Sequence, residues 1–124
     1  MNFNLKTTIL FMLAVVLIAS CNAQIKTLPV TDFEKMLTRN DVLLVDVRTP
    51  EEFQQQHLPN AININYNSSD FITQIKQLDS TKTLLLYCKS GNRSNKAVQL
   101  LQQEGIINVY ELEGGITAWN NTHQ

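Results

Sequence analysis

Short runs of apolar residues alternate along the chain with stretches in which apolar residues recur every three or four positions. Residues 42–45 and 83–87 are apolar at successive positions, a pattern typical of strands that are covered on both faces of a sheet. Shorter runs at 25–28, 61–64 and 108–112 predict further strands, so that the sheet has about five.

Helices are predicted between these strands. Thr31, with an acidic residue three positions later, is a candidate helix cap, and Thr49-Pro50 places proline in the first turn of a second helix. Apolar residues at helical spacing over 71–78 and 97–101 predict two more helices, the last of which ends at Gly105. Strands that alternate with helices pair in parallel through right-handed crossovers. We therefore expect an α/β fold, a small three-layer domain with a central, mostly parallel sheet flanked by helices.

The composition agrees with a single folded domain. The chain has 124 residues, of which 44% are hydrophobic and 17% charged, and its net charge is −1. Lysine and arginine are scattered singly, so the chain has no basic run that would attract a phosphate backbone. We expect no nucleic-acid partner.

The first 20 residues have a different character. Lys6 precedes an uninterrupted apolar run over residues 9–19, which is shorter than the roughly 20 residues that a membrane-crossing helix needs. A basic start, a short apolar core and small residues before a cleavage point describe an export signal. The end of the run, Ile18-Ala19-Ser20-Cys21, resembles the lipobox of bacterial lipoproteins. This resemblance implies cleavage before Cys21 and acylation of its thiol; the alternative is a plain signal peptide with an incidental cysteine.

These features divide the chain into a lipoprotein signal peptide at 1–20, an acylated cysteine and short linker at 21–28, and a folded domain at 29–124. The lipid would hold the domain at a membrane surface. We therefore expect a membrane-anchored lipoprotein of the bacterial cell envelope that faces the periplasm or the cell exterior.

The second cysteine, Cys88, has no partner in the chain if Cys21 is acylated. Oxidising compartments tend to pair thiols, so a leftover thiol indicates chemistry rather than structure. Cys88 follows a predicted buried strand, and the loop after it leads into a helix that we expect to begin near Asn95. Backbone N–H groups of such a loop can converge on the sulfur, lower its pKa and hold it as an exposed thiolate. A structural cysteine in an ordinary turn is the alternative.

Other residues of the loop suit the same chemistry. Lys89 and Arg93 would increase the reactivity of the thiol and attract a dianion such as thiosulfate. Gly91 allows close approach of the backbone, and Ser90 and Ser94 offer hydroxyl donors.

A second polar segment, Asp46-Val47-Arg48, follows another strand. Asp46 and Arg48 are expected to form an internal ion pair or cap that braces the loop rather than to act in catalysis. His57 and His123 are isolated and lack the spacing of metal ligands, so we expect neither a metal nor a cofactor.

The sequence resembles the rhodanese family in several motifs that occur in the family's order. They are residues 87–94 (YCKSGNRS), 46–48 (DVR) with 52–53 (EF), 57–63 (HLPNAIN) and 113–119 (EGGITAW). One departure is Gln56, where the family usually has glycine. The resemblance implies that Cys88 accepts sulfane sulfur and that Lys89, Ser90, Gly91, Asn92 and Arg93 form the substrate cradle.

The implied activity is a sulfurtransferase. It would move sulfur from a small sulfur-containing anion to a thiol or cyanide-like acceptor through a persulfide on Cys88. A sulfur carrier without turnover remains an alternative, because its loop would look the same. A cysteine-dependent phosphatase is a weaker alternative, because phosphatases of this fold have five residues between cysteine and arginine, whereas four separate Cys88 from Arg93.

Overall fold

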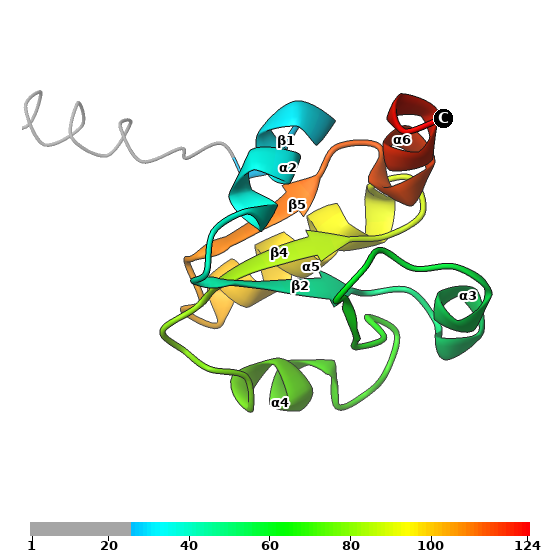
Figure 1. The fold of residues 1–124 in the computed structure, drawn as a ribbon. Coiled ribbons are helices and arrows are strands. Elements are labelled where there is room, and N and C mark those ends of the chain that lie inside the picture. The colour runs from blue at the N-terminus through cyan, green and yellow to red at the C-terminus, as the bar shows by residue number, and fades with distance from the viewer. Residues whose placement is uncertain (1–25) are drawn as a thin grey trace, which may run out of the picture.

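The computed structural model describes residues 26–124, which form one domain of alternating strands and helices (Figure 1). The predicted signal peptide and Cys21 lie outside these residues. In chain order the elements are β1 (Thr27–Leu28), α2 (Val30–Leu37), β2 (Val42–Asp46), α3 (Pro50–Gln55), β3 (Ile62–Asn63), α4 (Phe71–Lys76), β4 (Thr83–Tyr87), α5 (Asn92–Gln103), β5 (Val109–Leu112) and α6 (Gly115–Thr122).

The five strands form one sheet in the order β1-β5-β4-β2-β3, and every neighbouring pair is parallel. All strands therefore end at the same edge of the sheet, where β2 and β4 point toward α3 in Figure 1. The predicted three-layer α/β fold and its five strands are confirmed. Among the described residues, no helix is long and apolar enough to cross a membrane.

Each face of the sheet has its own apolar core. Helices α4 and α5 cover one face, where Leu84, Leu86 and Cys88 pack against residues such as Leu101. Helices α2 and α6 cover the other face, where Leu85 and Tyr87 pack with residues such as Phe33. Successive residues of β4 point to opposite faces, which explains why this strand is apolar at every position.

Two helix starts differ from the sequence prediction. Helix α2 begins at Val30 with Pro29 in the N-cap position, so Thr31 lies within the helix instead of capping it. Helix α5 begins at Asn92 rather than near Asn95, because Gly91 adopts a left-handed backbone (φ +100°) and turns the chain into the helix early. By contrast, Thr49 caps α3 as expected and forms a complete capping box with Glu52.

Candidate active site

Cys88 lies directly after β4, at the carboxyl edge of the sheet, and the next three residues make a tight turn into α5. The backbone N–H of Gly91 donates to Cys88 Sγ at 3.1 Å, and Ser94 Oγ lies 3.4 Å from the same sulfur. The early start of α5 puts Ser94 in the first helical turn, where its hydroxyl reaches the sulfur. Donors thus converge on one sulfur atom, as the loop pattern predicts.

The sulfur is more buried than expected. Cys88 is only 1% exposed, so the expectation of an exposed thiolate is wrong. The cause is the alternation of side chains along a strand. Cys88 lies on the same face as Leu84 and Leu86, so its side chain points into the core beneath α5. Lys89, Ser90 and Asn92, which follow Cys88 in the loop, are exposed.

The environment of the sulfur acts on its protonation in two directions. Burial raises the pKa of the Cys88 thiol, whereas hydrogen bonds from the Ser94 hydroxyl and from the backbone N–H groups of Ser94, Gly91 and Ser90 lower it. The hydrogen bonds outweigh burial, so the pKa of Cys88 lies below its ordinary value. This is the direction that a nucleophilic cysteine needs.

Arg93 points toward α3. Its two terminal nitrogens donate to the two carboxylate oxygens of Glu52 at 2.8 and 2.9 Å. The hydrogen bond from Arg93 is the main reason why the pKa of Glu52 falls to about 2. The same hydrogen bond is the main reason why the pKa of Arg93 is raised, and Cys88 adds a smaller electrostatic contribution. Arg93 therefore adds positive charge near the sulfur while it ties α5 to α3, and its predicted contact with substrate stays a prediction.

Asp46 and Arg48 form a buried ion pair at the end of β2. Asp46 is 0% and Arg48 5% exposed, and Arg48 Nη2 lies 2.7 Å from Asp46 Oδ2. Arg48 Nη2 also donates to the backbone carbonyl of Gln56 at 2.6 Å. The ion pair foreseen from sequence is present, and it fixes the segment that follows α3. Gln56 has an extended backbone (φ −164°), which any residue can adopt.

The start of α6 forms the wall behind the active-site loop. The backbone N–H groups of Ile116 and Thr117 donate to the carbonyl oxygens of Cys88 and Lys89 at 2.9 and 3.1 Å. Gly115 allows this contact, because a Cβ at its position would lie 2.5 Å from backbone atoms of Cys88 and Lys89. The sequence motif contained this glycine, but its structural task could not be derived from spacing.

Sequence reasoning missed Glu111, a buried carboxylate on β5 that is 2% exposed. Glu111 Oε2 accepts a hydrogen bond from Ser94 Oγ at 2.7 Å, which places it one hydroxyl away from Cys88. A charged residue inside an apolar strand is an unusual pattern, and that signal was available in the run 109–112.

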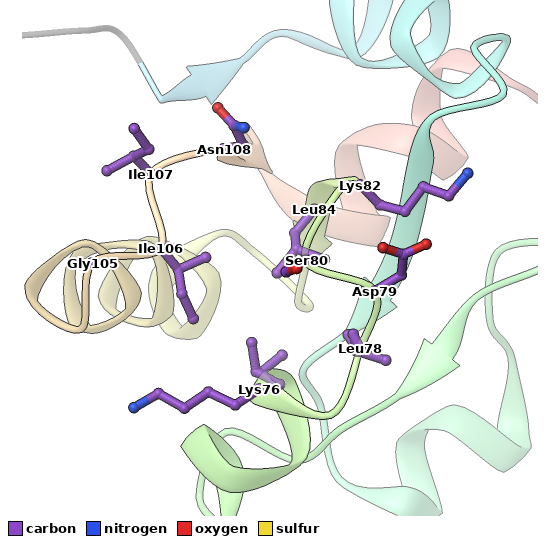
Figure 2. A pocket seen from close by; sticks show the side chains of 11 residues that line it. Lys76, Leu78, Asp79, Ser80, Lys82, Leu84, Gly105, Ile106, Ile107 and Asn108 are labelled. Carbon is purple, nitrogen blue, oxygen red and sulfur yellow. The ribbon is translucent and has the colours of Figure 1, made fainter.

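The remaining candidate features of the described residues lie away from this loop. A cavity of about 250 Å³ lies at the amino ends of β4 and β5, the opposite edge from Cys88, and Lys76, Leu84 and Ile106 are among its lining residues (Figure 2). His57 stacks on Phe53. The described residues include no group of three or more histidine, cysteine or acidic side chains that could hold a metal ion.

A parallel α/β domain that holds one thiol inside a ring of main-chain donors defines a class of cysteine-dependent group-transfer proteins. Within that class, the family model of the rhodanese-like domain matches residues 29–122. The chain belongs to the rhodanese-like domain family.

Known proteins agree with this assignment. The chain is 34% identical over 88 residues to the thiosulfate sulfurtransferase GlpE of Pseudomonas syringae, a match that covers 70% of this chain and 80% of that protein. It is 39% identical over 94 residues to the tRNA uridine(34) hydroxylase of Cytophaga hutchinsonii, covering 73% of this chain but 30% of that protein. The crystal structure of a rhodanese-related protein from Thermoplasma volcanium superimposes with a TM-score of 0.68 at 31% identity, covering 78% of this chain and 92% of that one.

The family and its relatives support sulfurtransferase activity in general, with a sulfur donor and a sulfur acceptor as substrates. The hydroxylase is a longer protein, and the match extends over less than a third of it. Its activity is therefore not transferred to this chain.

Proposed function

We propose that the protein is a sulfurtransferase that takes sulfane sulfur from an anion such as thiosulfate onto Cys88 as a persulfide and passes it to a thiol or cyanide-like acceptor. One observation carries the proposal: the Gly91 N–H and the first turn of α5 converge on Cys88 Sγ. This cradle stabilises a negatively charged sulfur.

In the first half-reaction the Cys88 thiolate attacks the outer sulfur of thiosulfate. An S–S bond forms at Cys88, the S–S bond of thiosulfate breaks, and sulfite leaves with the bonding electron pair. Negative charge then resides on the outer sulfur of the persulfide, where loop amides can stabilise it. In the second half-reaction the acceptor nucleophile attacks this outer sulfur, and Cys88 leaves as a thiolate.

Charged side chains of the loop would draw in the anionic donor. Lys89 is exposed and follows Cys88 directly, and Arg93 contributes its charge while it stays bound to Glu52. Ser90, Gly91 and Asn92 complete the proposed cradle. Asp46 and Arg48 support it by holding the segment after α3 in place.

The burial of Cys88 favours one second candidate, a carrier that loads sulfur once and delivers it to a specific partner. A sulfur atom that is covered in the free protein is reached slowly by small acceptors. Turnover with a small acceptor therefore separates a transferase from a carrier.

Incubation of the purified protein with thiosulfate should raise its intact mass by one sulfur atom, and cyanide should then remove that sulfur as thiocyanate. Continued thiocyanate formation with both reagents present would identify a transferase, whereas a single equivalent would identify a carrier. An unchanged mass after thiosulfate treatment would contradict thiosulfate as the donor and the persulfide with it.

We also propose that the chain is exported and anchored through an acylated Cys21, as the segment 18–21 suggests. Labelled palmitate should enter the wild-type protein in bacterial cells and should not enter the Cys21→Ala variant. Equal labelling of the two proteins, or no labelling of either, would refute the anchor.

A further inference from the structure

Glu111 occupies an unusual position for a charged side chain. It is 2% exposed, on the α5 side of β5, and it forms no ion pair among residues 26–124. Two hydroxyl groups contact its carboxylate: Thr27 Oγ1 lies 2.7 Å from Oε1, and Ser94 Oγ lies 2.7 Å from Oε2. An ionised carboxylate only accepts hydrogen bonds, so both hydroxyls can donate to it at once.

Ser94 cannot satisfy all of its neighbours with one hydrogen. Its Oγ lies 2.7 Å from Glu111 Oε2, 3.3 Å from the Gly91 carbonyl oxygen and 3.4 Å from Cys88 Sγ. The contact with Glu111 is the shortest and is a charge-assisted bond, which is the stronger kind. Glu111 therefore competes with Cys88 for the single hydrogen of the Ser94 hydroxyl, which is the hydrogen that Ser94 can donate to the sulfur.

We infer that Glu111 is a positioning residue that controls the protonation of Cys88 through Ser94. By drawing the Ser94 hydrogen toward its carboxylate, Glu111 weakens the hydrogen bond from Ser94 to the sulfur and so limits the stabilisation of the Cys88 thiolate. This role rests on the proposed function of Cys88 as the nucleophile.

Other charged groups do not replace Glu111 in this arrangement. The guanidinium of Arg93 is bound to Glu52. Helices α2 and α6 pack against the opposite face of the sheet from the Cys88 core. The charged or titratable side chains on the elements around β5 are Lys26 before β1, Asp32, Glu34 and Lys35 on α2, Tyr87 on β4, Arg93 and Lys96 on α5, and His123 after α6.

Replacing Glu111 by glutamine tests the inference with a side chain of equal size. The glutamine amide can donate to Ser94 Oγ while its carbonyl accepts from Thr27, which frees the Ser94 hydrogen to bond the thiolate. Removal of the nearby negative charge acts in the same direction. The pKa of Cys88 should therefore fall in Glu111→Gln, and below both pKa values alkylation by iodoacetamide should be about tenfold faster for a fall of one unit.

The measurement is the alkylation rate of Cys88 across pH in the full chain with Cys21→Ala, so that one thiol is present. Glu104→Gln is the matched control, because Glu104 is an exposed carboxylate at the far end of α5 and its removal should leave the titration unchanged. An unchanged or raised Cys88 pKa in Glu111→Gln would overturn the inference.

Ser94→Ala provides an independent test that remains usable if Glu111→Gln does not fold. Because Glu111 competes for the Ser94 hydrogen, loss of the hydroxyl should raise the pKa of Cys88 only slightly, and the effect of Glu111→Gln should shrink in the Ser94→Ala background. Alkylation slowed about tenfold in Ser94→Ala, a rise of about one pKa unit, would show that the sulfur rather than Glu111 holds this hydrogen and would overturn the inference. Because alkylation measures the thiol directly, this test can fail while thiosulfate loading succeeds, and the reverse is also possible.

Discussion

Gly115→Ala should unfold the protein more easily and disable its active-site loop. The new Cβ would lie 2.5 Å from the carbonyl oxygens of Cys88 and Lys89, and both are backbone atoms that cannot rotate away. Gly115 also has a left-handed backbone (φ +61°), which a side chain disfavours. Overpacking together with backbone strain should lower the free energy of unfolding by about 2–4 kcal/mol.

The same substitution should reduce sulfur transfer in the molecules that remain folded. To relieve the contact, the start of α6 must move away from the loop and weaken the hydrogen bonds from Ile116 and Thr117 to the carbonyls of Cys88 and Lys89. A displacement of about 1 Å at a reacting group can cost on the order of a hundredfold in rate. Urea unfolding and steady-state thiocyanate formation would measure the two effects separately.

Gly105→Ala is the matched control for this prediction. Gly105 is also left-handed (φ +81°), but a Cβ there has no neighbour within 4 Å. Its replacement should therefore cost only the backbone term, about 1 kcal/mol, and should leave sulfur transfer near the wild-type rate. If the two variants were equally stable, the close backbone contact at Gly115 would not be the cause of the lost stability.

Local patterns predicted the fold well because each pattern has a local physical cause. The apolar runs at 42–45 and 83–87 correspond to β2 and β4, and the Thr49 capping box starts α3 where expected. Helix α5 starts three residues earlier than the pattern predicts, because the conformation of Gly91 depends on the turn around it rather than on propensity. Sequence periodicity does not contain that information.

The sequence predicted only those parts of the candidate site that are contiguous along the chain. Cys88 and its loop follow from their position after a buried strand, whereas Glu52 and Glu111 reach the loop from 36 residues before and 23 residues after Cys88. Contacts of that kind depend on strand order and helix packing. The burial of Cys88 could have been foreseen, because it shares the parity of Leu84 and Leu86 in the strand.

The second large effect is expected for Cys88→Ser, which should abolish sulfur loading and lower turnover by at least about a thousandfold. A serine hydroxyl stays protonated at neutral pH and is a weak nucleophile, and it cannot form the S–S bond of a persulfide. The fold should persist, because serine is of similar size and its oxygen can accept the Gly91 N–H that now contacts Sγ.

Mass measurement after thiosulfate treatment tests this prediction, with Cys21→Ala as the control for the other cysteine. Cys21→Ala should gain one sulfur atom as the wild-type chain does, and Cys88→Ser should gain none. If Cys88→Ser gained the same mass and released it to cyanide, sulfur would reside elsewhere in the chain. The cradle around Cys88 would then stabilise a buried thiol without carrying the transferred sulfur, and the ring of donors would need another explanation.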